Sequence, residues 1–294
     1  VSATLLAREP AAAWTPLRGA ARALSVSGPA PPRPLAPLRW ISLGLRPDLK
    51  ESVVPPAWRP LLDDVTLEHR GKHGEIYRAT SRTGNPIVVK RVRLNDGPMS
   101  VDAAKREVAI MRALPRRPHF VQFLGSSGED RAKPGGEVHI MMEAANGDLA
   151  ELVLKNTQVS HSMKIRLFAD VLRGACELST MGLVHRDLKP DNILIFGDPT
   201  KSLDGCRAAI SDFGCACSER GGRWETPSLS GTPRYMAPEA WLPGRSRPAS
   251  DIWSLGIIFF ELLTGHYPGE LDKVRSGTNI KELRELRARV AEGL

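Results

Sequence analysis

The sequence predicts an α+β fold, because segments typical of strands dominate its first half and segments typical of helices follow. Short β-branched segments bounded by turn residues recur between residues 65 and 142. Apolar residues then recur at helical spacing over 162–181, and an apolar segment over 251–263 is typical of a buried helix. Strands and helices that are largely segregated along a chain indicate an α+β domain.

The first 60 residues differ in composition from the rest of the chain. They contain eleven of the 24 prolines, and eight basic against three acidic residues give +5 of the total charge of +8. Proline lacks an N–H donor and fixes φ, so we expect residues 1–60 to form a disordered Pro/Ala/Arg-rich tail. Residues 1–26 also have some features of a transit peptide, so organelle targeting stays open beside the cytoplasmic location that we expect. Because the chain begins at Val1, we expect its N-terminus to be incomplete.

Composition also limits the classes of partner. The remaining 33 basic and 30 acidic residues of 61–294 give a net charge of +3, so nucleic acid is not an expected partner. No apolar run reaches the 18 or more residues of a membrane span, and none is expected. The four cysteines form no CxxC pair and lack further zinc ligands at suitable spacing. We therefore expect reduced thiols.

The strand-rich part begins with three segments, 65–68, 75–79 and 87–92. A glycine-bearing turn separates the first two, and the residues Thr-Gly-Asn-Pro at 83–86 separate the second from the third. A helix follows from about Ser100, because apolar residues over 101–114 share one helical face. Two more strands, 121–124 and 138–142, complete this part.

The helical part has fewer and longer elements. The helix predicted over 162–181 ends at Gly182, and a short strand over 183–184 leads into the next loop. The apolar helix begins at Asp251, and the pattern of 280–291 predicts one further amphipathic helix.

Two motifs carry the chemistry. Residues 185–192 read HRDLKPDN, and Asp212-Phe213-Gly214 follow twenty residues later. In this short span Asp187 could orient a hydroxyl and Lys189 could hold a phosphate. Asn192 and Asp212 offer the oxygen ligands that Mg²⁺ prefers.

These motifs resemble, residue for residue, the catalytic loop and the metal-binding motif of eukaryotic serine/threonine protein kinases. The resemblance covers residues 61–294 and implies a bilobal fold, with a small β-rich N-lobe holding one main helix and a larger, mainly helical C-lobe. The implied boundaries are 61–143 for the N-lobe, 143–148 for the hinge and 149–294 for the C-lobe. The family normally adds several more helices, so we expect this C-lobe to be truncated.

The resemblance also assigns roles to residues. Asp187 would be the catalytic base, Lys189 would hold the γ-phosphate of ATP, and Asn192 and Asp212 would ligate Mg²⁺. Lys90 on the third strand would hold the α- and β-phosphates, and the carboxylate of Glu107 would hold the Lys90 ammonium in place. The full set of expected nucleotide-binding residues is Gly71, Gly74, Ile76, Val88, Lys90, Glu107, Met142, Glu143, Ala145 and Asp148.

The glycine loop departs from the family pattern, because His69 stands where the first glycine is expected. Lys189, two residues after Asp187, resembles serine/threonine rather than tyrosine kinases. The segment GTPRYMAPE at 231–239 agrees, and the resemblance implies that its Thr232 contacts Asp187 and Lys189. We therefore expect phosphorylation of Ser or Thr hydroxyls on protein substrates. The alternatives left open are a pseudokinase or nucleotide-binding scaffold and, less favoured, a dual-specificity or tyrosine kinase.

Regulation is a further expectation from the resemblance. The activation segment of the family corresponds to residues 212–239. Arg186, directly before Asp187, would pair with a phosphate on this segment. The candidate acceptors for an upstream activating kinase are Thr226, Ser228 and Ser230. A second basic residue of the usual phosphate pocket is absent, since Cys217 stands near its position.

Overall fold

The computed structural model describes residues 53–71, 74–94, 98–201, 204–220, 223–224, 230–241 and 246–268. All of them belong to one compact unit, residues 34–294. The helix that we expect over 280–291, and residues 1–52 of the expected tail, lie outside the described residues.

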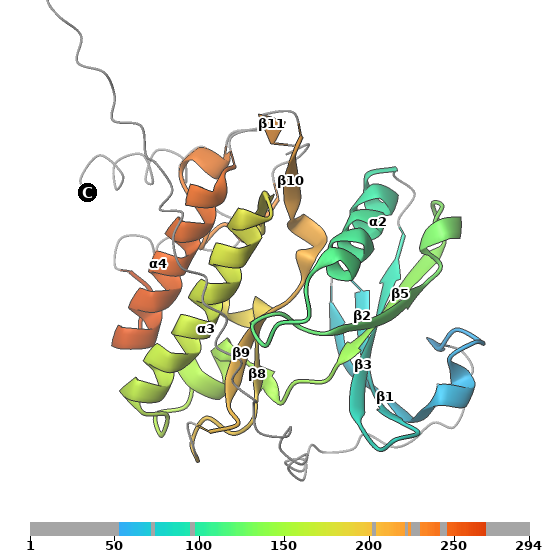
Figure 1. Cartoon of the computed structure of the whole chain (residues 1–294), viewed down its shortest axis with the longest axis horizontal. Helices are drawn as coiled ribbons and strands as arrows, with labels where there is room; N and C mark the ends of the chain where they lie inside the picture. Colours follow the sequence, from blue (N-terminus) through green and yellow to red (C-terminus); the bar gives the residue numbers. More distant parts are fainter. Residues whose placement is uncertain are drawn as a thin grey trace, which may run out of the picture. The chain divides into compact units, whose positions relative to one another are not determined.

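The small lobe is a five-stranded antiparallel sheet in the order β1-β2-β3-β5-β4. Its helix, α2 (Pro98–Ala113), comes between β3 and β4 in the chain (Figure 1). The five expected strands are present. Four of them extend beyond the expected bounds at both ends, whereas the strand expected over 121–124 begins and ends later, at Phe123 and Ser127. The strands are β1 (Leu62–Gly71), β2 (Gly74–Ser81), β3 (Pro86–Arg93), β4 (Phe123–Ser127) and β5 (Glu137–Glu143).

The central strand β3 is buried on both faces, and this decides where Lys90 points. Ile87 and Val89 belong to an outer apolar cluster, whereas Val88 belongs to the main core, with Val92 packed against it. Side chains alternate between the faces of a strand. Lys90 therefore points to the same side as Val88 and Val92, toward the main core and the large lobe.

The segment before β1 corrects the expected extent of the tail. Val53 and Val54 are buried in the outer cluster, and Trp58 packs against that cluster. A short 3₁₀ turn, Arg59–Leu61, then leads into β1. Residues 53–60 are thus part of the packed fold. Their apolar side chains cover the outer face of the sheet, which their proline-rich composition did not indicate.

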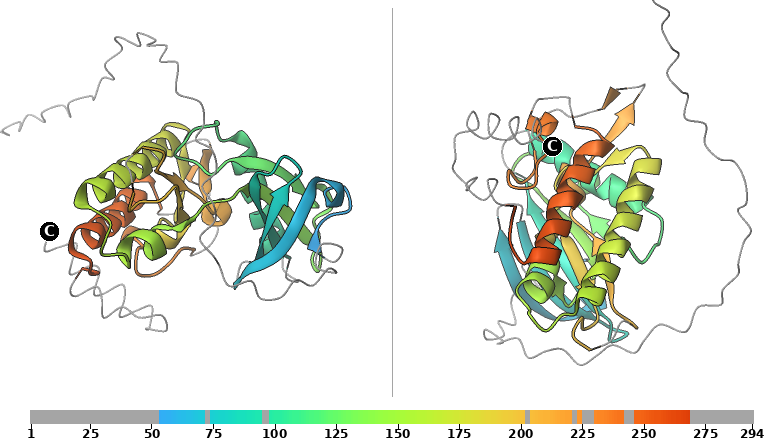
Figure 2. Two further views of the ribbon diagram at one scale, coloured as in Figure 1. Left: turned by 90° about the horizontal axis from the view of Figure 1, so that it is seen from below. Right: turned by 90° about the vertical axis from the view of Figure 1, so that its left-hand side faces the viewer.

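Two long helices form the body of the large lobe, α3 (His161–Thr180) and α4 (Pro248–Thr264). They lie side by side (Figures 1 and 2), with the rings of Phe168 and Phe259 stacked at 4.7 Å between centroids. The Ser160 side chain caps α3 by accepting the N–H of Met163. Proline in the first turn and Gly265 in the left-handed conformation bound α4.

Short strands line the part of the large lobe that faces the small lobe. One sheet has the order β6-β8-β9 and another the order β11-β10-β7. Of these, the sequence predicted only β7 (Leu183–Val184). The others are β6 (Gly147–Asp148), β8 (Ile193–Phe196), β9 (Arg207–Ile210), β10 (Cys217–Arg220) and β11 (Arg223–Trp224). The expected α+β bilobal fold is confirmed.

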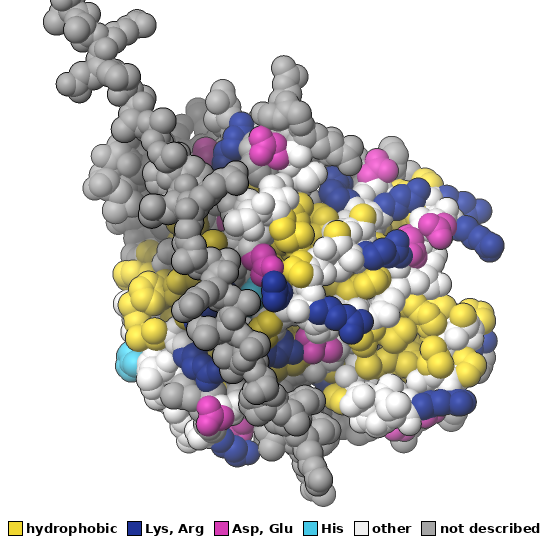
Figure 3. Space-filling view, in the orientation of Figure 1, with side chains coloured by type: hydrophobic (Ala, Val, Ile, Leu, Met, Phe, Trp, Pro, Cys, Tyr) yellow, Lys and Arg dark blue, Asp and Glu magenta, His cyan; other side chains and the backbone are white. Residues whose placement is uncertain are grey.

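The surface in Figure 3 mixes both signs of charge, with Lys and Arg side chains interspersed among Asp and Glu over the described residues. Within the described part of the chain, no helix has both the length and the apolar character that crossing a membrane requires. Cys176, Cys206, Cys215 and Cys217 form no disulfide in the described part of the chain.

Candidate active site

The buried Lys90 joins three segments of the chain. Its Nζ lies 2.6 Å from Oε1 of Glu107 on α2 and 3.0 Å from Oδ1 of Asp212. Lys90 and Glu107 are buried, whereas the Asp212 side chain is 33% exposed. The expected ion pair between Lys90 and Glu107 is confirmed. The same ammonium also reaches Asp212, which is 122 positions further along the chain.

Electrostatics keep Lys90 charged. Burial alone would lower the pKa of Lys90, but the carboxylates of Glu107 and Asp212 outweigh that effect and raise it. Burial raises the pKa of Glu107, although the Lys90 ammonium acts in the opposite direction. The site therefore holds a permanent ammonium at the position where phosphate oxygens are expected.

A second group of contacts surrounds Asp187. Lys189 Nζ donates to Oγ1 of Thr232 at 3.0 Å, and that hydroxyl donates to Oδ1 of Asp187 at 2.7 Å. Lys189 Nζ also lies 3.4 Å from Oδ2 of Asp187. Asn192 donates its amide N–H groups to the backbone carbonyl and to Oδ2 of Asp187, at 2.8 and 3.1 Å. The carboxylate of Asp187 is thus held from three sides, and the expected contacts of Thr232 are confirmed.

The loop that carries Asp187 is held by a buried carboxylate of α4. Asp251 accepts the backbone N–H of His185 at 2.7 Å and that of Arg186 at 2.9 Å. The His185 ring contacts the carbonyl of Ser211 at 2.9 Å, directly before Asp212. These bonds fix the catalytic loop to α4 and connect it to the metal-binding motif.

The segment around Gly231 passes close to the same loop. Gly231 has φ +120°, and a Cβ there would lie 2.4 Å from the carbonyl oxygen of Arg186. Only glycine allows this approach. Arg186 itself has φ 70° and donates from Nη1 to the carbonyl of Cys215 at 3.4 Å. Of the three expected phosphorylation positions, Thr226 and Ser228 lie outside the described residues, and Ser230 hydrogen-bonds the side chain of Cys215.

The donor set of the predicted metal site fits Mg²⁺. Asn192 uses its amide nitrogen for Asp187, which leaves its amide oxygen as a ligand of the type that Mg²⁺ prefers. Asp212 offers carboxylate oxygens to the same cation. Within the described ranges, no group of three or more His, Cys, Asp or Glu side chains is arranged to hold a metal ion. Roles for Asn192 and Asp212 as ligands stay predictions.

The glycine loop joins β1 and β2, and its two middle residues, 72 and 73, lie outside the described residues. Gly74 has φ +131°, and a Cβ there would lie 2.2 Å from the carbonyl oxygen of Arg91 on β3. Packing of the backbone therefore already requires glycine at 74. The space beside Gly71 is partly taken by the His69 ring, whose Nε2 lies 2.9 Å from where a Cβ would stand.

Three of the expected nucleotide-binding residues lie on the small-lobe strands and contact the main core. Met142 and Val88 are buried, and Ile76 is partly buried. The expected hinge begins at Glu143, the last residue of β5. The Ala145 carbonyl accepts an N–H of Arg78 on β2 at 2.9 Å. Asp148 accepts the backbone N–H of Glu151 at 2.8 Å, in the first turn of the short helix Ala150–Leu154. A role for Asp148 in nucleotide binding stays a prediction.

Comparison with known proteins decides the family. The family model described as protein kinase domain matches residues 69–291. The chain belongs to the protein kinase family. The match spans the Lys90, Asp187 and Asp212 positions described above, so the kinase motifs and the observed geometry concern the same residues.

Curated kinases resemble this kinase at moderate identity. A probable serine/threonine-protein kinase of Dictyostelium discoideum, gdt4, is 34% identical over 212 residues, which is 70% of this chain and 12% of that protein. Calcium-dependent protein kinase 27 of Arabidopsis thaliana is 32% identical over 198 residues, 66% of this chain and 38% of that one. The serine/threonine-protein kinase grp of Drosophila melanogaster is 30% identical over 221 residues, which is 73% of this chain and 41% of that protein. The chain spans less than half the length of each.

Several contacts of this kinase were not predicted from its sequence. Glu239 accepts the hydroxyl of Ser250 at 2.6 Å and so ties its segment to the start of α4. Arg78 holds the hinge at Ala145, and Arg207 of β9 bonds the carboxylate of Glu143 at 2.8 Å. These pairs join residues that are 11 to 67 positions apart in the chain, and no local sequence pattern indicates them.

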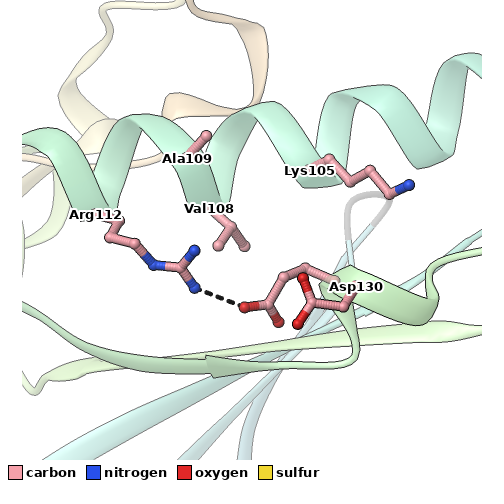
Figure 4. A pocket seen from close by; sticks show the side chains of 6 residues that line it. Lys105, Val108, Ala109, Arg112 and Asp130 are labelled. Carbon is pink, nitrogen blue, oxygen red and sulfur yellow. Dashed lines mark hydrogen bonds and ion pairs between the residues drawn. The ribbon is translucent and has the colours of Figure 1, made fainter.

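A hollow between α2 and the short turn Glu129–Arg131 lies apart from these groups. Its volume is about 330 Å³, and the Arg112 guanidinium is bonded to the carboxylate of Glu129 in it (Figure 4). Lys105 and Asp130 stand at its edge. None of its lining residues is a predicted site residue of the kinase, so we assign it no part in the chemistry.

Proposed function

We propose that the protein transfers the γ-phosphoryl group of ATP to Ser or Thr hydroxyls of protein substrates. The observation that supports this most is the position of Lys90, whose ammonium bridges Glu107 of the small lobe and Asp212 of the large lobe. An ion pair of this kind beside a metal-binding aspartate is what phosphoryl transfer by a kinase requires. The names of the curated relatives agree, since two of those described above are serine/threonine kinases.

In this proposal the residues of the chain do little covalent chemistry. Lys90 binds the α- and β-phosphates, and Lys189 binds the γ-phosphate. Asp187 orients the substrate hydroxyl and takes its proton. Its carboxylate is already fixed by Thr232, Lys189 and Asn192, so little reorganisation is needed when the substrate binds.

ATP use with a divalent metal is general in this family, and we propose Mg²⁺, held by Asn192 and Asp212. When bound, the cation neutralises negative charge on the phosphate oxygens. Glu107 contributes by holding Lys90 in place.

The test is turnover of Mg-ATP on mixed peptides that contain Ser, Thr or Tyr, followed by phosphosite mapping. We expect Ser and Thr products only, and Asp187→Asn should lower kcat by about 10²- to 10⁴-fold. ATP binding without turnover in a preparation containing the whole chain would favour the scaffold alternative. Products on Tyr would favour a dual-specificity or tyrosine kinase.

We further propose that an upstream kinase activates the enzyme by phosphorylating Thr226, Ser228 or Ser230. Arg186 supports this, because its guanidinium already reaches the backbone of the activation segment at Cys215. The variant with all three acceptors changed to Ala should lose the activated rate. Unchanged turnover after treatment with an activating extract would contradict the proposal.

A further inference from the structure

Arg207, the first residue of β9, makes three contacts, and one of them reaches the hinge at Glu143. Its Nη1 donates to the carbonyl of Pro118 at 2.7 Å, and its Nη2 lies 2.8 Å from Oε2 of Glu143. The guanidinium carbon stands 3.6 Å from the centre of the Phe196 ring on the neighbouring strand β8. A guanidinium held by stacking on an aromatic ring keeps a fixed plane, so Arg207 presents its donors in one orientation.

Glu143, the last residue of β5 and the first of the hinge, is held at both carboxylate oxygens. Oε1 accepts the backbone N–H of Gln122 at 3.0 Å, while Oε2 takes Arg207. The Glu143 N–H in turn donates to the Gln122 carbonyl at 3.1 Å. Arg207 and Glu143 side chains are each about one-quarter exposed, at 26% and 24%. The backbone of Glu143 therefore cannot shift without breaking a charge-assisted bond.

The strand that starts at Arg207 leads directly to the phosphate end of the site. Its last residue, Ile210, exchanges backbone hydrogen bonds with His119 and Val121 at 2.9 and 3.1 Å. Asp212 follows two residues later, so Arg207 and Asp212 are separated by at most about 18 Å of chain. One short segment thus contacts the hinge at one end and carries Asp212 at the other.

We propose that Arg207 is a positioning residue for the nucleotide, acting through Glu143. The proposal rests on the proposed function and on the role that the kinase resemblance implies for Glu143 and Ala145, whose backbone groups would bind the base of ATP. Arg207 fixes the hinge relative to the segment that carries Asp212, and so it sets the spacing between the base and the phosphates. Its loss weakens ATP binding and leaves the chemical step at Asp187 largely intact.

Steady-state kinetics of Arg207→Gln test this, with ATP varied at saturating peptide. Because the pair is partly exposed, we expect the KM for ATP to rise about threefold to tenfold and kcat to change by less than about twofold. Arg207→Lys should lie between wild type and Arg207→Gln, since an ammonium cannot bridge two acceptors while stacked on a ring. The KM for the peptide should not change.

Two further variants make the result specific. Glu143→Gln keeps an acceptor for Gln122 but removes the charge that Arg207 binds, and the double variant with Arg207→Gln should raise the KM no more than either single variant. Lys201→Ala is the matched control, because it breaks a 3.0 Å ion pair with Asp198 in the turn of the same hairpin without reaching the hinge. KM does not depend on the folded fraction, so partial unfolding does not mask the effect.

The outcomes separate this inference from the proposed function. An active wild type whose KM for ATP is unchanged in Arg207→Gln, or is changed equally by Lys201→Ala, would overturn the inference alone. Additive effects of Arg207→Gln and Glu143→Gln would also overturn it. A wild type that binds ATP but never transfers phosphate would instead contradict the proposed function.

Discussion

The hydroxyl of Thr232 donates a 2.7 Å hydrogen bond to Oδ1 of Asp187, although the two residues are 45 positions apart. The same hydroxyl accepts from Lys189 at 3.0 Å. Thr232 therefore connects the expected base and the expected phosphate ligand through a single oxygen atom. This contact makes the geometry of the catalytic loop depend on the segment around Gly231, which passes against the Arg186 carbonyl.

Replacing Thr232 by Val tests that dependence, because it removes the hydroxyl and keeps the shape. We expect kcat to fall about fivefold to tenfold, since Asp187 and Lys189 lose their shared partner. Thr232→Ser keeps the hydroxyl and should restore most of the rate. Initial-rate kinetics at saturating ATP measure the effect, and equal rates for the Val and Ser variants would show that the hydroxyl has no role.

Glu107→Gln tests the ion pair with Lys90. The amide can still accept from Lys90 but loses the charge that helps hold the ammonium, so kcat/KM for ATP should fall about tenfold to hundredfold. Asp102→Asn, on an exposed position of the same helix α2, is the control and should leave kcat/KM unchanged. A loss of equal size in the control would assign the effect to the helix rather than to the pair.

The lowered pKa of Glu75 on β2 makes the stability of the fold depend on pH. Burial would raise the pKa of Glu75, but the Tyr77 hydroxyl and the guanidinium groups of Arg93, Arg70 and Arg91 outweigh it and lower the pKa below 4.5. A lowered folded-state pKa stabilises the fold above the unfolded value of 4.5, and this contribution is lost as the pH falls through the folded pKa.

Glu75→Gln should therefore lower the free energy of unfolding at pH 7 by about 1–2 kcal/mol. The difference from wild type should shrink as the pH is lowered past 4.5. Urea unfolding at several pH values measures both effects. Glu68→Gln is the control, because its carboxylate is 33% exposed and should contribute less than about 1 kcal/mol. A constant difference between Glu75→Gln and wild type at all pH values would contradict the linkage.

The four thiols should differ in reactivity. Burial raises the pKa of Cys206 and of Cys217 to about 11, so almost no thiolate forms there at neutral pH. Cys176 is exposed. Iodoacetamide at pH 7.5 should label Cys176 first in the native protein, and Cys206 and Cys217 only after unfolding. Peptide mass spectrometry reads each site, and native labelling of Cys217 at the rate of Cys176 would contradict its burial.

The sequence predicted the parts of the site that are contiguous or that follow a family motif. Asp187, Lys189 and Asn192 lie within six residues, and the structure brings all three together around one carboxylate. The Lys90–Glu107 pair was also predicted, because both residues match positions of the kinase family. The long elements β3, α3 and α4 agreed because their apolar residues follow a clear periodicity or form a long apolar segment.

The sequence could not predict contacts that depend on tertiary placement. The strands β6 and β8 to β11 have two to four residues each, too short for periodicity to indicate them. Val53 and Val54 are buried because the outer face of the sheet needs a cover, which composition alone does not reveal. The bond between Arg207 and Glu143 spans 64 positions and exists only because β9 begins beside the hinge.

The bond from Asp251 to the loop before Asp187 has a mechanical consequence. Asp251 lies in the first turn of α4, and its carboxylate accepts the N–H of both His185 and Arg186. A tilt of this helix would therefore move the backbone of His185 and Arg186, and with it the carboxylate of Asp187, the proposed base. A molecule that binds to α4 and changes its tilt would thus change the rate of the proposed reaction without competing with ATP or the peptide.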